Sequence, residues 1–159
     1  MKLGKYLWIY VPLVIVLTLD ITSKAIAIST LSSGTTFNLL WGLVSLQLAH
    51  NTGIAFGFFT SYTSIILALV TILVLAGYFY IFKTEKRYHI PVSVVLAGAL
   101  GNLLDRLMSP AGVTDFISIP SFAIFNFADI AITCGIGYII LVMMLEPLLK
   151  KRKKAQQTL

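Results

Sequence analysis

The sequence predicts an all-α membrane protein with four transmembrane helices and a small β platform on the outer side. The 159-residue chain is 58% hydrophobic and 11% charged, whereas about a quarter of the residues in a soluble domain are charged. Its mean hydropathy is +0.92. A helix needs ~20 apolar residues to cross a bilayer, and four stretches reach that length: 6–28, 62–82, 90–108 and 124–145. We treat residues 1–159 as one integral membrane domain.

The first apolar stretch differs from a cleaved signal peptide, although two lysines precede it. It is longer than the apolar region of a signal peptide and lacks a clear small-x-small cleavage site. It also contains Asp20 and Lys24. We therefore expect this stretch to be a retained transmembrane helix.

The basic residues predict the orientation of the chain in the membrane. They cluster at Lys2 and Lys5, in the connection 83–89 and in the run 150–154, whereas the connection 29–61 has no charged residue. By the positive-inside rule, both termini and the connection 83–89 are cytoplasmic. The net charge of +6 is thus a signal of topology and membrane-lipid contact, and the pattern disfavours nucleic-acid binding.

Two segments outside the predicted spans are expected to form strands. The segment 43–51, "LVSLQLAHN", alternates between apolar and polar residues as a half-buried strand does. The segment 116–125, "FISIPSFAIF", would supply a second extended piece, interrupted at Pro120. Glycines 34 and 42 mark turns around the first strand.

Aromatic residues are frequent in the uncharged connection after the first span: Trp41, Phe56, Phe58 and Phe59. They would either anchor this connection at the membrane interface or cover a site as a lid. We favour the anchoring role, because aromatic residues are common at membrane interfaces.

Several kinds of catalytic group are disfavoured. Cys134 is the single cysteine, so there is no disulfide framework, and its apolar surroundings predict a buried structural thiol. His50 and His89 fall on opposite sides of the membrane in the predicted topology, so no Ser-His or Cys-His arrangement is expected.

The chain has only six acids, and most of them gather at one depth of the membrane. Glu85 and Glu146 lie at the cytoplasmic margin. The other four acids and two basic residues fall near the outer ends of the spans: Asp20, Asp105, Asp115, Asp129, Lys24 and Arg106. A charge within the hydrocarbon region costs at least ~2.5 kcal/mol, so such groups are rare without pairing or function.

Helical spacing separates the structural charges from the functional ones. Asp20 and Lys24 are four residues apart and share a helix face, which predicts a structural ion pair. Asp105 and Arg106 are also expected to be mainly structural, at the end of a helix whose small residues at 97–101 allow close packing.

Asp115 and Asp129 differ, because neither has a basic residue at helical spacing. Asp129 also lies where a lone carboxylate is costly. The pattern therefore favours a functional rather than a structural role for this pair.

Five short blocks, in order, carry a resemblance to a known family. They are "DITSK" (20–24), "NTGIAF" (51–56), "AGALGNLLDR" (97–106), "VTDF" (113–116) and "FNFAD" (125–129). Over nearly its whole length the chain resembles bacterial lipoprotein signal peptidase (signal peptidase II). This resemblance implies an intramembrane aspartyl protease of the bacterial inner membrane, active near the outer face. The substrate would be a diacylglyceryl-modified prolipoprotein, cut before its lipidated cysteine.

The resemblance also implies roles for individual residues. The catalytic pair corresponds to Asp115 and Asp129. Substrate-binding positions correspond to Asn51, Gly53, Asn102, Arg106, Asn126 and Ala128, and supporting positions to Asp20, Lys24 and Asp105. No metal or cofactor is implied, and we expect a monomer. The chain departs from the family pattern with Ala97 for glycine, Ile54 for alanine and Thr114 for valine.

Two other functions remain as alternatives. A small transporter or channel subunit would use the acids to line a polar path, but the inner halves of the second and fourth spans have almost no polar residues. A structural membrane partner would use the charges only to hold its helices together.

Overall fold

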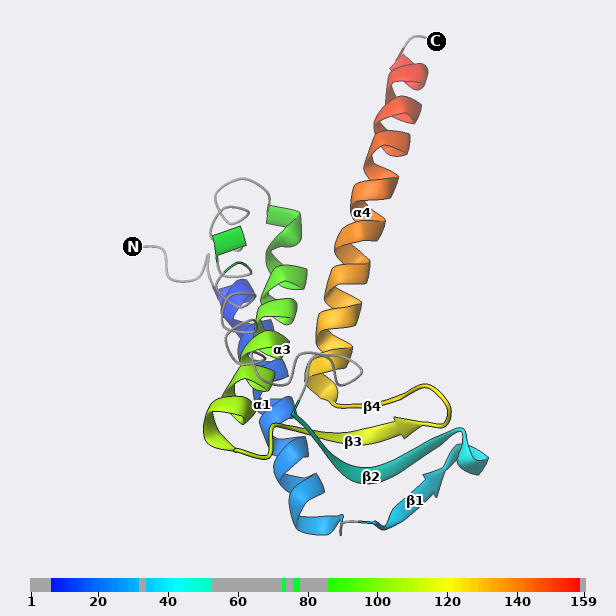
Figure 1. Cartoon of the computed structure of the whole chain (residues 1–159). Coiled ribbons are helices and arrows are strands. Elements are labelled where there is room, and N and C mark those ends of the chain that lie inside the picture. Colours follow the sequence, from blue (N-terminus) through cyan, green and yellow to red (C-terminus); the bar gives the residue numbers. More distant parts are fainter. Residues whose placement is uncertain (1–6, 32–33, 53–72, 74–75, 78–85, 158–159) are drawn as a thin grey trace.

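The computed structural model describes residues 7–31, 34–52, 73, 76–77 and 86–157. Its described part is mostly helical and contains a small antiparallel sheet (Figure 1). The long helices are α1 (Leu7–Thr30), α3 (His89–Met108) and α4 (Phe127–Gln157). The strands are β1 (Thr36–Leu39), β2 (Val44–Asn51), β3 (Val113–Ile119) and β4 (Ala123–Phe125), and the short 3-10 helices are η2 (Leu40–Gly42) and η5 (Lys86–Tyr88).

Three helices in the described part of the chain are long and apolar enough to cross a membrane. The candidate spans are Tyr10–Thr30, Lys86–Met108 and Phe127–Pro147. They agree with the first, third and fourth spans predicted from the sequence. The predicted span 62–82 lies outside the described residues, apart from three isolated positions.

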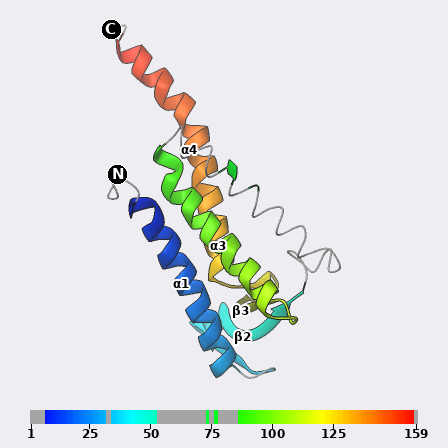
Figure 2. The same ribbon diagram turned by 90° about the vertical axis from the view of Figure 1, so that its left-hand side faces the viewer.

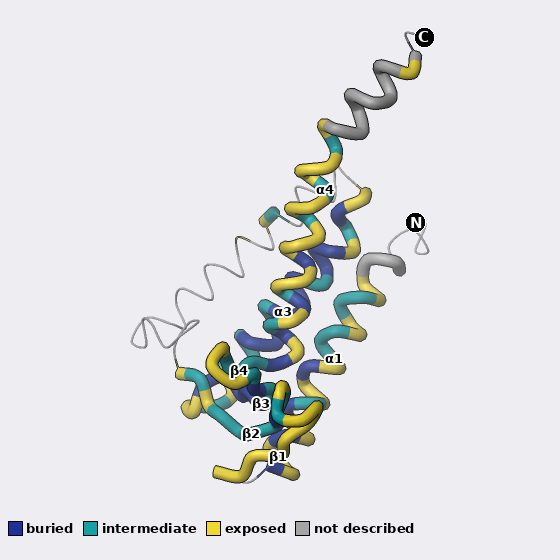
Figure 3. The backbone as a smooth tube through the Cα atoms, turned by 90° about the vertical axis from the view of Figure 1, so that its right-hand side faces the viewer, coloured by how far each residue is buried: buried dark blue, intermediate teal, exposed yellow. Residues whose placement is uncertain are grey.

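Helix α3 lies between α1 and α4 and is the most buried of the three (Figure 2). Its small residues permit this packing. A Cβ atom added at Gly98 would lie 2.5 Å from the carbonyl oxygen of Ala128, and one at Gly101 would collide with the Asp20 carboxylate. The outward faces of α1 and α4 expose many large apolar side chains, as expected for surfaces that face lipid (Figure 3).

The four strands form one sheet in the order β1-β2-β3-β4, with antiparallel neighbours. The sheet packs against the last turns of α1, where Ala27 and Leu31 form a buried cluster with Phe116 of β3. Leu46 and Leu48 of β2 cover this cluster. The sheet is therefore fixed to one end of the helix bundle (Figure 1).

The strand predictions are largely confirmed. The segment predicted at 43–51 forms β2, and the segment predicted at 116–125 is split into β3 and β4 by the turn at Pro120. Strand β1 was not predicted, because four residues are too few for a clear pattern. Strand β3 begins earlier than expected, so Asp115 lies within a strand rather than in a connection.

The predicted start of the fourth span is wrong. Ile124 and Phe125 belong to β4, where Ile124 pairs with Ser118 of β3, and α4 begins only at Phe127. The Asn126 side chain caps the helix, since its Oδ1 accepts a hydrogen bond from the backbone N–H of Asp129 at 3.0 Å. An apolar run alone does not distinguish the last residues of a buried strand from the first residues of a helix.

Candidate active site

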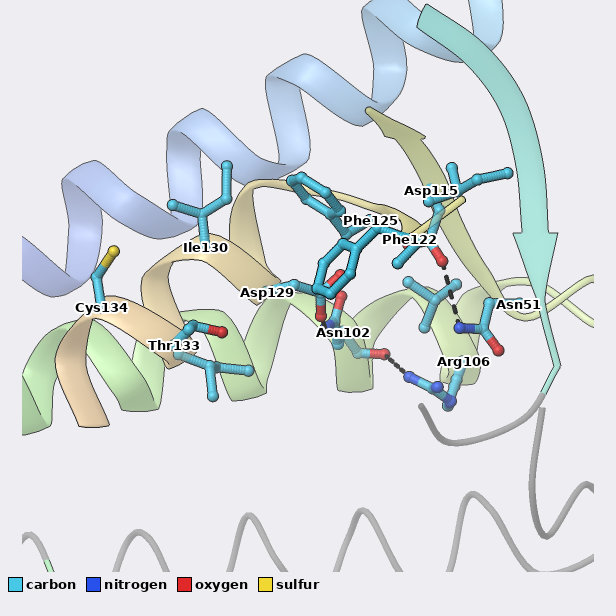
Figure 4. Close-up of a pocket in the computed structure, with 14 residues that line it drawn as sticks. Asn51, Asn102, Arg106, Asp115, Phe122, Phe125, Asp129, Ile130, Thr133 and Cys134 are labelled. Atoms are coloured by element: carbon cyan, nitrogen blue, oxygen red, sulfur yellow. Dashed lines mark hydrogen bonds between the residues drawn. The ribbon is translucent and has the colours of Figure 1, made fainter. Parts of the chain in front are cut away.

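The two aspartates that the sequence singles out line the same cavity. This cavity has a volume of about 610 Å³ and lies where the sheet meets α3 and α4 (Figure 4). Asp115 comes from β3 and Asp129 from the first turn of α4. Asn51 of β2, with Asn102 and Arg106 of α3, lines the same space. The structure thus brings together polar residues from four separate elements.

Asp115 is almost fully buried and accepts hydrogen bonds on both carboxylate oxygens. Asn126 Nδ2 donates to its Oδ1 at 2.7 Å, and Asn51 Nδ2 donates to its Oδ2 at 3.3 Å. Burial, and secondly the nearby charge of Asp129, raise the pKa of Asp115 to about 6. The two asparagine hydrogen bonds oppose this rise, since they favour the ionised carboxylate. Asp115 therefore retains a proton at pH values at which an exposed aspartate is ionised.

Asp129 is held by a different set of hydrogen bonds. Asn102 Nδ2 donates to Asp129 Oδ1 at 2.8 Å, and the backbone N–H of Asn126 donates to Asp129 Oδ2 at 3.1 Å. Because Asn126 Oδ1 also accepts from the Asp129 backbone, these two residues cap the helix reciprocally. The position of Asp129 is thus set by the start of α4 itself.

Two buried asparagines connect the carboxylates. The Asn126 amide donates to Asp115 Oδ1 and also to Asn102 Oδ1 at 3.1 Å. Asn102 in turn donates to Asp129. A continuous set of amide groups therefore runs from one carboxylate to the other. Since Asn126 is completely buried and Asn102 nearly so, these hydrogen bonds do not compete with bulk water.

A buried ammonium group lies behind this amide network. Lys24 Nζ lies 2.7 Å from Asp20 Oδ2 and 3.1 Å from Asp105 Oδ2, and it donates to Asn102 Oδ1 at 3.0 Å. The predicted Asp20–Lys24 ion pair is confirmed. The prediction that Asp105 serves mainly at the end of its own helix is incomplete, because Asp105 also links α3 to α1 through Lys24.

Each acid that binds Lys24 also holds the backbone next to one of the cavity aspartates. Asp20 Oδ1 accepts from the N–H of Ala128, which precedes Asp129, at 2.9 Å. Asp105 Oδ2 accepts from the N–H of Thr114, which precedes Asp115, also at 2.9 Å. One ammonium group therefore fixes the backbone before both aspartates.

The remaining predicted site residues have different positions. Arg106 lines the cavity, and its Nη1 donates to the backbone oxygen of Asn102 at 3.2 Å. Ala128 is fully buried and takes part through its backbone N–H. Gly53 lies outside the described residues. Within the part of the chain that is described, no three His, Cys, Asp or Glu side chains gather to hold a metal ion.

Much of the cavity wall consists of residues that no pattern in the sequence singled out as part of a site. The wall includes Phe122 and Phe125 from the β3–β4 region and Ile130, Thr133 and Cys134 from α4. The expectation that Cys134 is buried is wrong, because its side chain is exposed along this wall. Helical spacing contained only part of this signal, since Thr133 alone of these α4 residues lies four positions after Asp129 and so shares its helix face.

The cavity residues fall within a match to a known family. Residues 12–145 match the family described as signal peptidase (SPase) II. The chain belongs to this family. Relatives that are 32–37% identical to the chain carry the name lipoprotein signal peptidase, so the chain is a protease of the signal peptidase II type. The predicted family and activity are confirmed, and the transporter alternative loses its support.

Three relatives illustrate the extent of this similarity. The lipoprotein signal peptidase of Fusobacterium nucleatum is 37% identical over 146 residues, which cover 88% of this chain and 86% of the relative. That of Rhodococcus jostii is 34% identical over 142 residues, covering 84% and 71% respectively. That of Brevibacillus brevis is 32% identical over 150 residues, covering 88% and 97%.

The fold is also similar to solved structures of bacterial membrane enzymes. One, determined by the in meso method at 2.3 Å resolution, superposes with a TM-score of 0.75 at 26% identity and covers 97% of this chain and 93% of that chain. A second, at 1.9 Å, has a TM-score of 0.75 at 27% identity and covers 90% and 94%. Together with the apolar helices, these findings identify a multi-pass membrane protein.

Proposed function

We propose that this signal peptidase hydrolyses the peptide bond before the lipidated cysteine of diacylglyceryl-modified prolipoproteins, with Asp115 and Asp129 as its catalytic pair. The observation that carries this proposal is that both carboxylates line one cavity and are connected through Asn126. A pair of carboxylates in a shared, partly apolar site is the arrangement that aspartic proteases use.

The environment of the pair supports a division of roles. Since its pKa is raised to about 6, we assign the shared proton to Asp115 and the role of general base to Asp129. These states belong to a coupled pair, so the titration observed in an assay is that of the pair as a whole. The Asp129 carboxylate acts as general base, and the Asp115 carboxyl as general acid.

The reaction then proceeds by addition of one water molecule to the scissile bond. Asp129 removes a proton from the water as its oxygen attacks the carbonyl carbon, while the Asp115 proton stabilises the developing charge on the carbonyl oxygen. The C–N bond breaks, and the proton taken up by Asp129 is delivered to the leaving amine of the cysteine. Arg106 and Asn102 line the cavity and would hold substrate backbone oxygens.

The shape of the cavity supports a lipidated substrate. Its wall of Phe122, Phe125 and Ile130 suits the apolar residues of a signal peptide and the acyl chains beside the cleavage site.

We also propose that both termini are cytoplasmic and that the cavity lies near the outer face of the membrane. The basic run 150–154 is at the end of α4 that is remote from the sheet (Figure 1). Basic residues favour the cytoplasmic side. Termini on one side require an even number of crossings, so the stretch 62–82 would supply the fourth span.

The test is cleavage of a synthetic diacylglyceryl-modified prolipopeptide by the purified protein in detergent. Asp115→Asn and Asp129→Asn should each lower kcat by a factor on the order of 10³ or more, because neither step has a substitute for the missing carboxylate. Glu146→Gln is the matched control, since Glu146 pairs with Arg87 at 2.9 Å outside the cavity. Near-normal cleavage by either asparagine variant would overturn the role of that residue.

A second measurement separates catalysis from structure. Both asparagine variants should retain a cooperative thermal transition in detergent, because asparagine preserves the size of aspartate and one acceptor oxygen. If they instead lost the folded protein, the carboxylates would serve only to hold the helices together.

A further inference from the structure

One end of the sheet carries both of its tight turns. The strands are antiparallel in the order β1-β2-β3-β4, and Ser45 near the start of β2 pairs with Ser118 near the end of β3. The β1–β2 turn and the β3–β4 turn therefore lie at the same end of the sheet (Figures 1 and 3). We call residues 39–43 and 120–122 together the turn end of the sheet.

The turn end exposes large apolar side chains. Trp41 is 98% exposed, and Leu43 and Phe122 are each 68% exposed. Turns in contact with water are usually built from Gly, Pro, Asn, Asp and Ser. The sequence has no charged residue in 29–61 or in 116–128, so neither turn carries a charge.

The backbone of the first turn is strained. Leu40, Trp41 and Gly42 have φ angles of +48°, +57° and +87°, so three successive residues lie in the left-handed region. Glycine adopts this region freely, whereas large L-residues rarely do, because their Cβ atoms crowd the backbone. An observed strain of this kind is a reason to look for a function. Here it accompanies the almost complete exposure of the Trp41 ring.

The depth of the sheet relative to α1 indicates what contacts the turn end. The sheet packs on Ala27 and Leu31, and Ala27 belongs to the 21-residue candidate span Tyr10–Thr30. At ~1.5 Å per residue this span is ~32 Å long, close to the ~30 Å hydrocarbon thickness of a bilayer. Since the sheet adjoins the end of the span, it lies at the boundary between hydrocarbon and headgroups.

The surface of α4 continues to the same place. Phe127 at the start of α4 is exposed on a candidate membrane span, and the nearby Ile130, also partly exposed, lines the cavity together with Phe122 of the turn end. An apolar surface that faces lipid along α4 therefore extends to the turn end of the sheet.

We propose that the turn end of the sheet is inserted into the membrane interface, with Trp41 at the headgroup boundary and the neighbouring apolar side chains among the acyl chains. The partner is the lipid surface, because the patch is uncharged, adjoins the lipid-facing helices and carries an amphipathic ring suited to this depth. Phe122 belongs both to this patch and to the wall of the cavity, so insertion places the cavity rim beside lipid.

The test uses the fluorescence of Trp41. The chain has two tryptophans, so Trp8→Phe leaves Trp41 as the single emitter. The variant is reconstituted into phosphatidylcholine vesicles whose acyl chains carry bromine either near the headgroup or near the methyl end. We expect loss of most of the emission with shallow bromine, a smaller loss with deep bromine, and little quenching by acrylamide in the water. Strong acrylamide quenching without bromine quenching would overturn the proposal.

A second copy of the chain is the competing partner for this surface. Emission that is protected from acrylamide and from both bromine positions, and that becomes accessible when the protein is diluted in lipid, would also overturn the proposal. Since neither quencher measures peptide cleavage, failure of this test is distinct from failure of the proposed catalytic pair.

An independent label covers the case in which Trp8→Phe does not fold. A nitroxide attached to Trp41→Cys in a Cys134→Ser background should collide more often with oxygen, which is enriched in lipid, than with a water-soluble nickel complex. The reverse order of accessibility would contradict insertion.

Discussion

Asn126 Nδ2 donates a hydrogen bond to Asp115 Oδ1 over 2.7 Å. The backbone N–H of the same asparagine donates to Asp129 Oδ2 over 3.1 Å. One completely buried residue therefore contacts both carboxylates and sets how β3 and α4 approach each other. Because its side chain also caps α4, the start of the helix and the geometry of the carboxylate pair depend on the same amide group.

Asn126→Ala should impair both activity and stability. It removes the amide between the carboxylates and leaves buried polar groups without a partner, which costs about 1–3 kcal/mol. We expect the thermal midpoint in detergent to fall. We also expect kcat/KM to fall by at least about tenfold, because the carboxylates are no longer held in place; this corresponds to about 1.4 kcal/mol of lost transition-state stabilisation. The control is Asn38→Ala, which alters an exposed asparagine of β1. Equal values for the two variants would contradict a bridging role.

Stability should decrease as the pH rises through the titration of Asp115. Its pKa is about 6 in the folded protein, against 3.8 ordinarily, so the folded state binds the proton more tightly. This tighter binding adds to the free energy of unfolding. The added free energy is fully present below pH 3.8 and is lost as the pH rises through 6. This change is on the order of 3 kcal/mol. Thermal midpoints measured from pH 4 to pH 7 test this prediction. In the Asp115→Asn variant, the thermal midpoint should depend less on pH over the same range.

Asn51→Leu should move the alkaline limb of the pH–rate profile to higher pH. The hydrogen bond from Asn51 favours the ionised form of Asp115, so its removal raises the pKa of Asp115 further. The active form of the pair, with one shared proton, then persists to higher pH. The profile of kcat/KM for the free enzyme reports this limb. Asn38→Leu is the control and should leave the profile unchanged. If the alkaline limb of the Asn51→Leu profile stayed in place or moved to lower pH, the prediction would be refuted.

Lys24→Met should destabilise the protein strongly. The ammonium group is buried between Asp20 and Asp105, and removal of one partner from a buried ion pair costs about 3–5 kcal/mol. The backbone before both cavity aspartates loses its fixed support at the same time. The thermal midpoint in detergent and kcat on the prolipopeptide are the measurements.

Neutralising one acid should recover part of this loss. Lys24→Met combined with Asp20→Asn restores the net charge of the cluster, and asparagine keeps an acceptor oxygen for the N–H of Ala128. The double variant should therefore be more stable than Lys24→Met alone. If it were less stable, the effect of Lys24 would come from packing rather than from charge.

Gly98→Ala should separate α3 from α4. An added Cβ atom would lie 2.5 Å from the carbonyl oxygen of Ala128 and 2.9 Å from Ile132 Cγ1, so one helix must shift. Overpacking of this kind costs about 1–3 kcal/mol. Gly137→Ala in α4 meets no atom within 4 Å and should be neutral or stabilising. A lower thermal midpoint for Gly137→Ala than for Gly98→Ala would contradict close helix contact at Gly98.

Local patterns in the sequence predicted those features that depend only on neighbouring residues. Apolar runs located the helices α1, α3 and α4, and alternation located β2. The four-residue spacing of Asp20 and Lys24 predicted their ion pair, because such residues share a helix face. The start of α4 was misplaced, since an apolar strand and an apolar helix look alike until the cap at Asn126 is recognised.

The sequence by itself determined that the chain is an apolar membrane protein with two acids that lack a basic residue at helical spacing, and its five short blocks indicated the peptidase family. Acids of this kind are costly in an apolar chain, which marked them as candidates for function. Only the tertiary structure decided which groups surround those acids. Lys24 meets Asn102 across 78 positions, and Asp20 meets the backbone of Ala128 across 108. Contacts over such separations arise from the packing of α1, α3 and α4, which no local periodicity encodes, and so does the exposure of Cys134 along the cavity.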